Sequence, residues 1–439
     1  MSSNKLQFRV QPGGSLSGRL RVPGDKSISH RSIMLGSLAD GVTHVSGFLE
    51  GEDSLATLRV FQAMGVKIDG PSDGEVTING VGVDGLKAPT APLDLGNSGT
   101  AMRLMCGLLA GQGFDTTLVG DSSLTKRPMR RVTDPLAAMN AVIDTSEGGT
   151  APLHIRPTTT LCGIDYTMPV ASAQVKSCVL LAGLYAEGET CVTEPAPTRD
   201  HTERMLQGFG YPVTRNGNRV CIRGGGRLRA CDIDVPADIS SAAFFLVGAS
   251  IATGSDLLLE HVGMNPTRDG VINILRLMGA VIGVLDPRDV RGEPVADLHV
   301  RSAPLKGIRI PEDQVPLAID EFPVLFVAAA CAEGETVLTG AEELRVKESD
   351  RIQVMADGLQ VLGVDARPTA DGIVIQGGAI GSGRVDSHGD HRIAMAFTIA
   401  GLRAGGEIVI EDCENVNTSF PRFVELASGV GSRVSLTGD

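Results

Sequence analysis

The sequence lacks tryptophan and has few other aromatic residues, which make up 3% of its 439 residues. Proteins that hold single-stranded nucleic acid use aromatic side chains on which bases stack, and they usually present a basic surface. Acidic residues outnumber basic ones here, so that the formal net charge is −13. We therefore expect no nucleic acid as partner, and any anion-binding site must be a local group of cations in an acidic protein.

Closely spaced metal ligands are also missing. The eight cysteines include no C-x-x-C pair, and the eight histidines are scattered along the chain. A structural zinc site needs clustered ligands, so we expect no metal. Most of the cysteines lie in apolar runs, which is typical of reduced, buried thiols in a cytosolic protein.

Long hydrophobic segments are absent as well. The longest apolar run, Phe322–Ala332, is too short to cross a bilayer, and Met1–Val10 lacks the charged start and apolar stretch of a signal peptide. Apolar residues make up 42% of the chain and charged residues 21%, a balance typical of globular proteins, and the length suggests two or three domains. We expect a soluble, cytoplasmic protein.

A repeated pattern runs through almost the whole chain. Segments that begin at Leu20 and Ile233 both read as a short strand, Val-Pro, small polar residues, an apolar helix, a glycine turn and a second strand. In both, a second helical stretch follows and ends at Met-Gly. Weaker copies begin near Pro92, Tyr166, Ile308 and Val385, so that six repeats follow one another at intervals of about 73 residues.

The repeats predict a mixed α/β (α+β) fold of two domains, each with three βαβαββ-type repeats. The first helix of each repeat is apolar on nearly all sides, so we expect these parallel helices to be buried within the domains. The strong match between the first and fourth repeats suggests duplication of a three-repeat half. We expect one domain at residues 22–235, the other at 1–21 with 236–439, hinges near residues 21 and 235, and a cleft between them. The first twenty residues should then pair with the C-terminal half.

Polar motifs stand at the helix starts of the N-terminal half. Helix N-termini suit phosphate and carboxylate groups because their N–H groups are unpaired and the dipole is positive there. In PGDKSISHRS, Lys26 and Ser27 begin a helix, and Arg31 follows one turn later. Capping could explain Asp25 and Ser27, but it does not explain the neighbouring cations.

Further motifs of this half carry alternative interpretations. NSGTAMR (Asn97–Arg103) could be a helix cap or an anion nest, and ASAQVKS could place Ser172 and Gln174 toward a ligand or toward the helix end. LTKRPMRR could be a solvated charge run, although the rigid Pro128 favours a positioned Arg127. PTRDHTERM places Arg199 and His201 before a second helix.

The C-terminal half adds carboxylates to the cations. Asp320 and Glu321 precede an apolar helix, where a carboxylate is either a dipole partner or a candidate base. RVKESDR brings Lys347, Glu348 and Arg351 within about one turn, a spacing that a salt-bridged helix face would also show. GDHRIAMAF places Asp390, His391 and Arg392 at another helix start.

The cations of these motifs form the local basic group that the acidic total conceals. Arginine suits bidentate binding of carboxylate and phosphate, and this many cations at one cleft indicate two phosphorylated ligands, or a phosphate and a carboxylate-phosphate. They are Lys26, Arg31, Lys126, Arg127, Lys176, Arg199, Lys347, Arg351 and Arg392.

Along its whole length the sequence resembles the 5-enolpyruvylshikimate-3-phosphate synthase family, in the motifs PGDKSISHR, LTKRPM, ASAQVKS, RVKESDR and DHRIAMAF. The resemblance implies transfer of an enolpyruvyl group from phosphoenolpyruvate to the 5-hydroxyl of shikimate 3-phosphate, a step toward aromatic amino acids. It also implies a two-domain fold of three repeats each, without metal or organic cofactor, and we expect a monomer.

The resemblance also implies roles for individual residues. The catalytic residues would be Asp320 as general base and Glu348 with Lys26 as proton donors. Ligands of shikimate 3-phosphate would be Lys26, Ser27, Arg31, Ser172, Ala173, Gln174, Arg199, Asp320 and Lys347. Ligands of phosphoenolpyruvate would be Lys26, Gly99, Arg127, Gln174, Arg351 and Arg392.

Two positions bear on how closely the family pattern is kept. Thr418 stands where many members have a lysine, which puts one phosphate contact in doubt. Gly99 stands where some members have an alanine that crowds glyphosate, so we expect inhibition by glyphosate.

Three other functions fit the sequence less well. The sister UDP-N-acetylglucosamine enolpyruvyl transferases usually have a reactive cysteine in the loop that here reads GDSSLTKRPMRR, and Cys106 lies in an apolar helix instead. An RNA 3′-phosphate cyclase type conflicts with the acidic charge and the few aromatics. A binding module would not need Asp320 and Glu348, unless they form buried salt bridges.

Overall fold

The computed structural model describes residues 6–158 and 160–437, so the expectation about the start of the chain falls partly outside the described residues. Contacts group the chain into two compact units. The N-terminal unit is Gly24–Val235, and the C-terminal unit is Met1–Pro23 together with Pro236–Asp439. Each unit is described by itself.

The N-terminal unit contains the first three repeats. The first has α1 (Lys26–Leu38), β3 (Ala39–Ser46), α2 (Glu52–Ala63), β4 (Lys67–Ser72) and β5 (Glu75–Val81). The second has β6 (Leu93–Asp94), α3 (Gly99–Ala110), β7 (Thr116–Val119), the 3₁₀ turn η1 (Leu124–Lys126), α4 (Arg130–Ala138), β8 (Val142–Ser146) and β9 (Thr150–Arg156). The third has β10 (Asp165–Thr167), α5 (Ala173–Gly183), β11 (Glu189–Thr193), α6 (His201–Gly208), β12 (Thr214–Asn216) and β13 (Arg219–Arg223). The short strands β14 (Leu228–Arg229) and β15 (Ile233–Asp234) return to β3.

The C-terminal unit contains the other three repeats. The fourth has β2 (Ser17–Leu20), α7 (Ile239–Ile251), β16 (Asp256–Gly263), α8 (Gly270–Leu277), β17 (Val281–Val290) and β18 (Glu293–Arg301). The fifth has η2 (Glu312–Gln314), α9 (Phe322–Ala330), β19 (Glu335–Leu338), η3 (Glu342–Val346), α10 (Arg351–Val361), β20 (Asp365–Pro368) and β21 (Ile373–Gln376). The sixth has β22 (Gly383–Asp386), α11 (His391–Ala400), η4 (Gly401–Arg403), β23 (Ile408–Glu411), η5 (Glu414–Thr418), α12 (Phe423–Gly429), β24 (Val434–Thr437) and β1 (Gln7–Val10).

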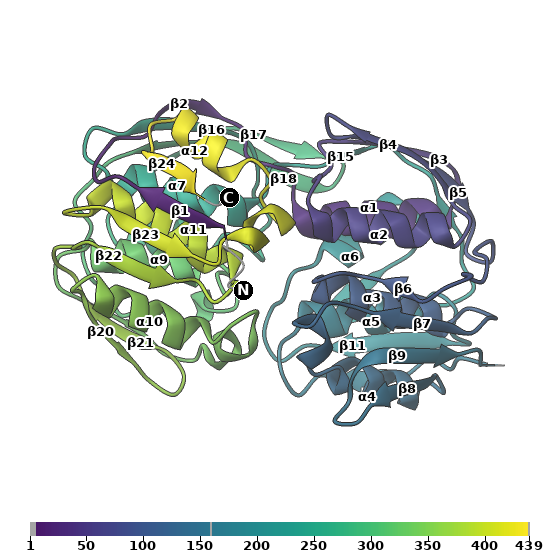
Figure 1. Cartoon of the computed structure of the whole chain (residues 1–439). Coiled ribbons are helices and arrows are strands. Elements are labelled where there is room, and N and C mark those ends of the chain that lie inside the picture. The colour runs from purple at the N-terminus through teal and green to yellow at the C-terminus, as the bar shows by residue number, and fades with distance from the viewer. Residues whose placement is uncertain (1–5, 159, 438–439) are drawn as a thin grey trace. The chain divides into compact units, whose positions relative to one another are not determined.

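The sheets share one strand order, which confirms the predicted βαβαββ repeat, although the fifth sheet (β19-β21-β20) has only isolated parallel bridges in place of its first strand. In β6-β7-β9-β8 and β10-β11-β13-β12, the first strand is parallel to the second, and the other pairs are antiparallel. The sixth repeat keeps this order as β22-β23-β1-β24. Figure 1 shows the purple β1 among the yellow strands of the chain's other end. As expected, β1 and β2 both pair within the C-terminal half, β2 with β16.

The first helices of the repeats are buried, as their apolar sequences predicted. Every residue of α7 and α9 is buried, and α7, α9 and α11 contact one another in the core of the C-terminal unit. In the N-terminal unit, α3 and α5 approach so closely that a Cβ on Gly107 would lie 2.0 Å from the carbonyl oxygen of Cys178. Glycine is therefore required at position 107, because any side chain there would force the helices apart.

The cysteines differ from the expectation at one place. Cys191 on β11 lies opposite Cys221 on β13, and the two form a disulfide, so the expectation of eight reduced thiols is wrong for this pair. The strand register brings the two residues together across 30 positions of sequence, a relation that no local spacing reveals. Glu189 lies beside the two sulfur atoms. Because the sulfurs are bonded to each other, they present no thiolate to a metal.

The apolar run that was too short to cross a bilayer forms α9 and the turn after it. Within the described part of the chain, no helix has both the length and the apolar character of a membrane span.

Candidate active site

The start of α1 contains one capping residue, followed by two candidate ligands. Asp25 caps the helix, since its carboxylate accepts a hydrogen bond of 2.9 Å from the N–H of Ile28. Nζ of Lys26 lies 3.1 Å from a carboxylate oxygen of Asp53, in the first turn of α2. Ser27 is partly exposed. Sequence reasoning missed Asp53, because the acidic first turn of a helix is usually only a dipole partner.

Arg31 is buried between three segments of the N-terminal unit. Its guanidinium donates to Oγ1 of Thr202 (2.7 Å), to Oγ of Ser177 (2.9 Å) and to the carbonyl of Ser27 (2.8 Å). These partners come from α6, α5 and α1, so one side chain fixes the relative position of three helix starts. All three oxygens are neutral.

Lys176 corrects the list of cations predicted to bind anions. Its ammonium is fully buried, 3.0 Å from Glu194 and 2.8 Å from Glu203, and it donates to the carbonyl of Thr198. Burial raises the pKa of Glu203, and the charge of Lys176 opposes this rise. Lys176 is thus a structural ion partner that holds the loop with Arg199, which is itself partly exposed.

The loops around α3 hold Arg127 and Gly99. Ser98 caps α3 by accepting from the N–H of Ala101, and Gly99 is buried. Arg127 donates to the side-chain carbonyl of Asn97 (2.8 Å), whose amide donates in turn to Asp121 (2.7 Å). Arg127 is therefore positioned, as Pro128 suggested, whereas Lys126 is exposed.

The start of α5 combines a cap with a second polar side chain. Ser172 caps the helix through the N–H of Val175 (3.4 Å). Ala173 is the first helical residue, and the side-chain carbonyl of Gln174 accepts from Arg103 at 2.8 Å. Ser172 therefore serves the helix end, as one alternative for this motif expected, whereas Gln174 belongs to a side-chain network with Arg103.

His30 is a buried polar residue that the sequence did not single out. A hydrogen bond of 2.8 Å joins its Nδ1 to Oγ1 of Thr57, and its Nε2 lies 3.5 Å from Oγ of Ser98. Burial, with the charges of Lys26 and Arg31, lowers the pKa of His30 well below its usual value. The neutral imidazole links α1 and α2 to the cap of α3.

The C-terminal unit has a different cluster, built around Arg351. This arginine is almost fully buried and donates to Asp390 (2.8 Å), Asp320 (3.3 Å) and Glu348 (2.6 Å). Burial alone would lower its pKa, but the carboxylates of Asp390, Glu348 and Asp320 raise it above the usual value. The same ion pair lowers the pKa of Asp390, against the effect of burial. A second N–H from Nη2 reaches Asp390, so four of the five guanidinium N–H groups are used.

Two further cations lie beside Asp320. Lys347 is 3.5 Å from its carboxylate and 3.3 Å from Glu343, and Arg392 donates to the backbone carbonyl of Asp320 at 3.0 Å. Lys347 belongs to the bend between η3 and α10, so RVKESDR is not a helix face but the loop that enters α10. The structure thus brings together all five residues predicted in this unit.

The fourth repeat keeps the cap of the first repeat but not its cations. Asp238 caps α7, in the place that Asp25 has in α1. Arg268 reaches Asp238 at 2.9 Å from another segment and also donates to Ser240, whose hydroxyl bonds to Glu321. This network is buried, so the repeated motif serves packing here.

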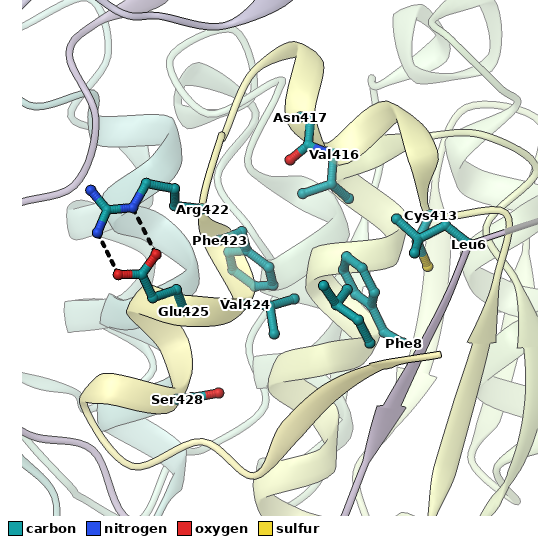
Figure 2. A pocket seen from close by; sticks show the side chains of 11 residues that line it. Leu6, Phe8, Cys413, Val416, Asn417, Arg422, Phe423, Val424, Glu425 and Ser428 are labelled. Atoms are coloured by element: carbon teal, nitrogen blue, oxygen red, sulfur yellow. Dashed lines mark hydrogen bonds and ion pairs between the residues drawn. The ribbon is translucent and has the colours of Figure 1, made fainter. Parts of the chain in front are cut away.

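A cavity of about 330 Å³ lies elsewhere in the C-terminal unit, between β1, η5 and α12. Figure 2 shows apolar side chains such as Phe8, Val416 and Phe423 on its wall, with an ion pair between Arg422 and Glu425. None of the predicted site residues lines it. Thr418 lies outside it as well, and its hydroxyl bonds to the carbonyl of Asn415.

Comparisons with known proteins give one consistent result. The family described as EPSP synthase (3-phosphoshikimate 1-carboxyvinyltransferase) matches residues 10–426. A 3-phosphoshikimate 1-carboxyvinyltransferase of Alkalilimnicola ehrlichii is 74% identical over 98% of this chain and 97% of its own. One of Methylococcus capsulatus is 70% identical over the whole of both chains.

Solved structures agree with the sequence comparisons. An EPSP synthase from Acinetobacter baumannii is 59% identical, covers 98% of this chain and all of its own, and superposes with a TM-score of 0.90. The enolpyruvyl transferase NikO from Streptomyces tendae shares the fold, with a TM-score of 0.80 at 15% identity over 99% of this chain and all of its own.

Proposed function

The chain belongs to the EPSP synthase family, and from this premise we propose how its two clusters share one reaction. The protein is an enzyme that transfers the enolpyruvyl group of phosphoenolpyruvate to the 5-hydroxyl of shikimate 3-phosphate and releases phosphate. We propose that the N-terminal and C-terminal units are its two three-repeat domains, and that each supplies part of the binding machinery.

We propose that the two substrates are held by their anionic groups. Shikimate 3-phosphate would bind Lys26, Ser27, Arg31, Ser172, Ala173, Gln174, Arg199, Asp320 and Lys347. Phosphoenolpyruvate would bind Lys26, Gly99, Arg127, Gln174, Arg351 and Arg392. The proposal is supported by the ligands that lie at helix starts, where helix dipoles add to the side-chain charges. These ligands are Lys26, Ser27, Gly99, Ala173, Gln174, Arg351 and Arg392. Fixing both reactants removes much of the entropic barrier of a two-substrate step.

The observation that carries this proposal is the ring of carboxylates around Arg351. Only one of its N–H groups is left by the four bonds to Asp320, Glu348 and Asp390. An incoming carboxylate or phosphate can therefore bind Arg351 through two N–H groups only if it replaces one of these partners. Replacement of Glu348 or Asp320 would release a carboxylate beside the substrate at the moment when proton transfer is needed.

We propose that Asp320 removes the proton of the 5-hydroxyl while that oxygen attacks C2 of phosphoenolpyruvate. Glu348, together with Lys26, would deliver a proton to the methylene carbon, which gives a tetrahedral phospho-ketal. Loss of phosphate and of a proton from the new methyl group then regenerates the double bond. Lys347 and Arg351, at 3.5 and 3.3 Å, balance the charge of Asp320 before the substrates bind.

The test is release of inorganic phosphate from phosphoenolpyruvate by the full chain. We expect release with shikimate 3-phosphate and none with UDP-N-acetylglucosamine. Release with the sugar nucleotide alone would reject the proposal. The sister reaction is further disfavoured because Cys106 is fully buried and burial raises its pKa to about 12, which leaves no reactive thiolate.

We also propose a cytoplasmic, monomeric enzyme without a nucleic acid partner, in keeping with the acidic composition. Light scattering of the purified chain, with and without both substrates, tests the monomer. A dimer under both conditions would exclude it.

A further inference from the structure

Arg103 contacts Gln174 and lies beside Gly99, two of the proposed phosphoenolpyruvate ligands of the N-terminal unit, although it is not itself one of these ligands. It is almost fully buried in α3, with 8% of its surface exposed. One Nη donates to the side-chain carbonyl of Gln174 at 2.8 Å, and the other donates to the carbonyl of Pro128 at 3.3 Å, next to Arg127. A Cβ placed on Gly99 would lie 3.0 Å from its Nη1.

A guanidinium has five donors and no acceptor, so the contact with Arg103 determines which end of the Gln174 amide faces it. The carbonyl end must point to Arg103, and the NH₂ end must point away. One N–H of this NH₂ group donates to Oγ1 of Thr100 at 3.0 Å. The other N–H has no partner among the described residues, so it remains for a ligand.

We propose that Arg103 is a positioning residue that makes Gln174 a hydrogen-bond donor toward phosphoenolpyruvate. A reversed amide would turn its carbonyl oxygen toward an anionic substrate, where it repels instead of binding. Arg103 thereby sets the polarity of a ligand that sequence comparison identifies only as a glutamine. This inference rests on the proposed binding of phosphoenolpyruvate by Gln174.

The test is a double-mutant cycle in the full chain, with the Michaelis constants of both substrates and the melting temperature measured for each variant. We expect Arg103→Met to raise the KM for phosphoenolpyruvate about tenfold, as loss of one oriented charge-assisted bond does. The KM for shikimate 3-phosphate should rise less than this, because Gln174 is only one of the nine ligands proposed for that substrate. In the Gln174→Met background, the same substitution should change the KM for phosphoenolpyruvate less than about threefold.

The outcomes separate the inference from the function on which it rests. If Gln174→Met leaves the KM for phosphoenolpyruvate unchanged, the ligand assignment itself fails. If Gln174→Met raises it and the effects of Arg103→Met and Gln174→Met multiply, Arg103 acts independently of Gln174 and the inference is rejected. Arg130→Met, which removes an exposed arginine at the start of α4, is the matched control and should change neither KM by more than about twofold.

Gln174→Glu tests the same contact without changing Arg103, in case Arg103→Met does not fold. A glutamate can pair with Arg103 but offers no donor on its other side. We expect the melting temperature to be kept or raised while the KM for phosphoenolpyruvate rises about a hundredfold. A fall in melting temperature of several degrees would show that Arg103 does not face the acceptor end of residue 174, and would overturn the proposal.

Discussion

Two buried arginines, one in each unit, differ in the groups to which they donate. In the N-terminal unit, Arg31 donates to the hydroxyls of Thr202 and Ser177 and to a backbone carbonyl. In the C-terminal unit, Arg351 is bound by the carboxylates of three residues. A neutral oxygen adds no negative charge beside a guanidinium, whereas a carboxylate does.

The difference fits a division of labour between the units. Cations held by neutral groups can attract substrate anions directly. Cations held by carboxylates keep those carboxylates ionised and positioned until a substrate competes for the arginine. We propose that the charge of Arg31 serves binding, and that the cluster around Arg351 holds carboxylates for proton transfer. Four predictions test this comparison.

The largest effect is expected for the proposed base. Asp320→Ala should lower kcat by a factor of about 10²–10⁴, because the hydroxyl loses the group that accepts its proton. Steady-state kinetics at saturating substrate measure this effect. Asp53→Asn, which changes the carboxylate beside Lys26 in the other unit, should lower kcat by less than about tenfold. Turnover of Asp320→Ala near the wild-type level would show that Asp320 is not the general base.

Removing Arg351 should lower the free energy of unfolding more than removing Arg31 does. Arg351→Met leaves Asp320, Glu348 and Asp390 without their shared cation, and we expect it to lower the free energy of unfolding by about 3–5 kcal/mol. Arg31→Met leaves hydroxyls that can bond to each other, since Thr202 already donates to Ser177, and should cost about 1–3 kcal/mol. Urea unfolding followed by circular dichroism compares the two variants. An equal or larger cost at Arg31 would contradict the comparison.

A smaller effect is expected at Gly99. A Cβ there would lie 3.0 Å from Nη1 of both Arg103 and Arg127, so each guanidinium would have to shift by only a few tenths of an ångström. Gly99→Ala should therefore change stability by less than about 1 kcal/mol while raising the KM for phosphoenolpyruvate about tenfold. The inhibition constant of glyphosate should rise more than this KM, if Gly99 leaves room for the inhibitor. If wild type and Gly99→Ala have equal KM values for phosphoenolpyruvate, the substrate does not occupy the space at residue 99.

The smallest effect concerns pH and the N-terminal unit. The folded-state pKa of His30 lies below the unfolded value near 6.5, so the unfolded state binds more protons below that pH. The stability that His30 contributes is present above about pH 6.5 and is lost as the pH falls, by at most about 1.4 kcal/mol per pH unit. Melting temperatures of wild type and His30→Asn at pH 7.5 and 5.5 measure this loss, which should be smaller in the variant. His44→Gln, at an exposed histidine of β3, is the control and should behave like wild type.

Much of this molecule could be predicted from local sequence. The six repeats, their βαβαββ order and the burial of α7 and α9 follow from apolar periodicity, which depends only on neighbouring residues. The starts of α1, α5 and α11 were predicted because capping residues and charges occur there within a few positions of one another.

Several contacts between residues that lie far apart in the sequence could not be predicted from local patterns. Lys176 was assigned to anion binding because its motif contains a cation, but Glu194 and Glu203 approach it only in the folded unit. Asp53 is brought to Lys26 by the packing of α2 on α1, and Arg103 to Gln174 by the packing of α3 on α5. Cys191 and Cys221 meet only through strand register.

The sequence by itself determined which kind of fold this chain adopts and which family it resembles, because both are written in short-range patterns and in motifs. Only the tertiary structure decided whether each charge is held by neutral oxygens or by carboxylates. A pair such as Arg351 and Asp390 is separated by 39 residues, and its energy depends on distance and burial, which sequence spacing does not encode. Arg31 and Arg351 are therefore similar in sequence, although Arg31 donates to hydroxyl and carbonyl oxygens and Arg351 to carboxylates.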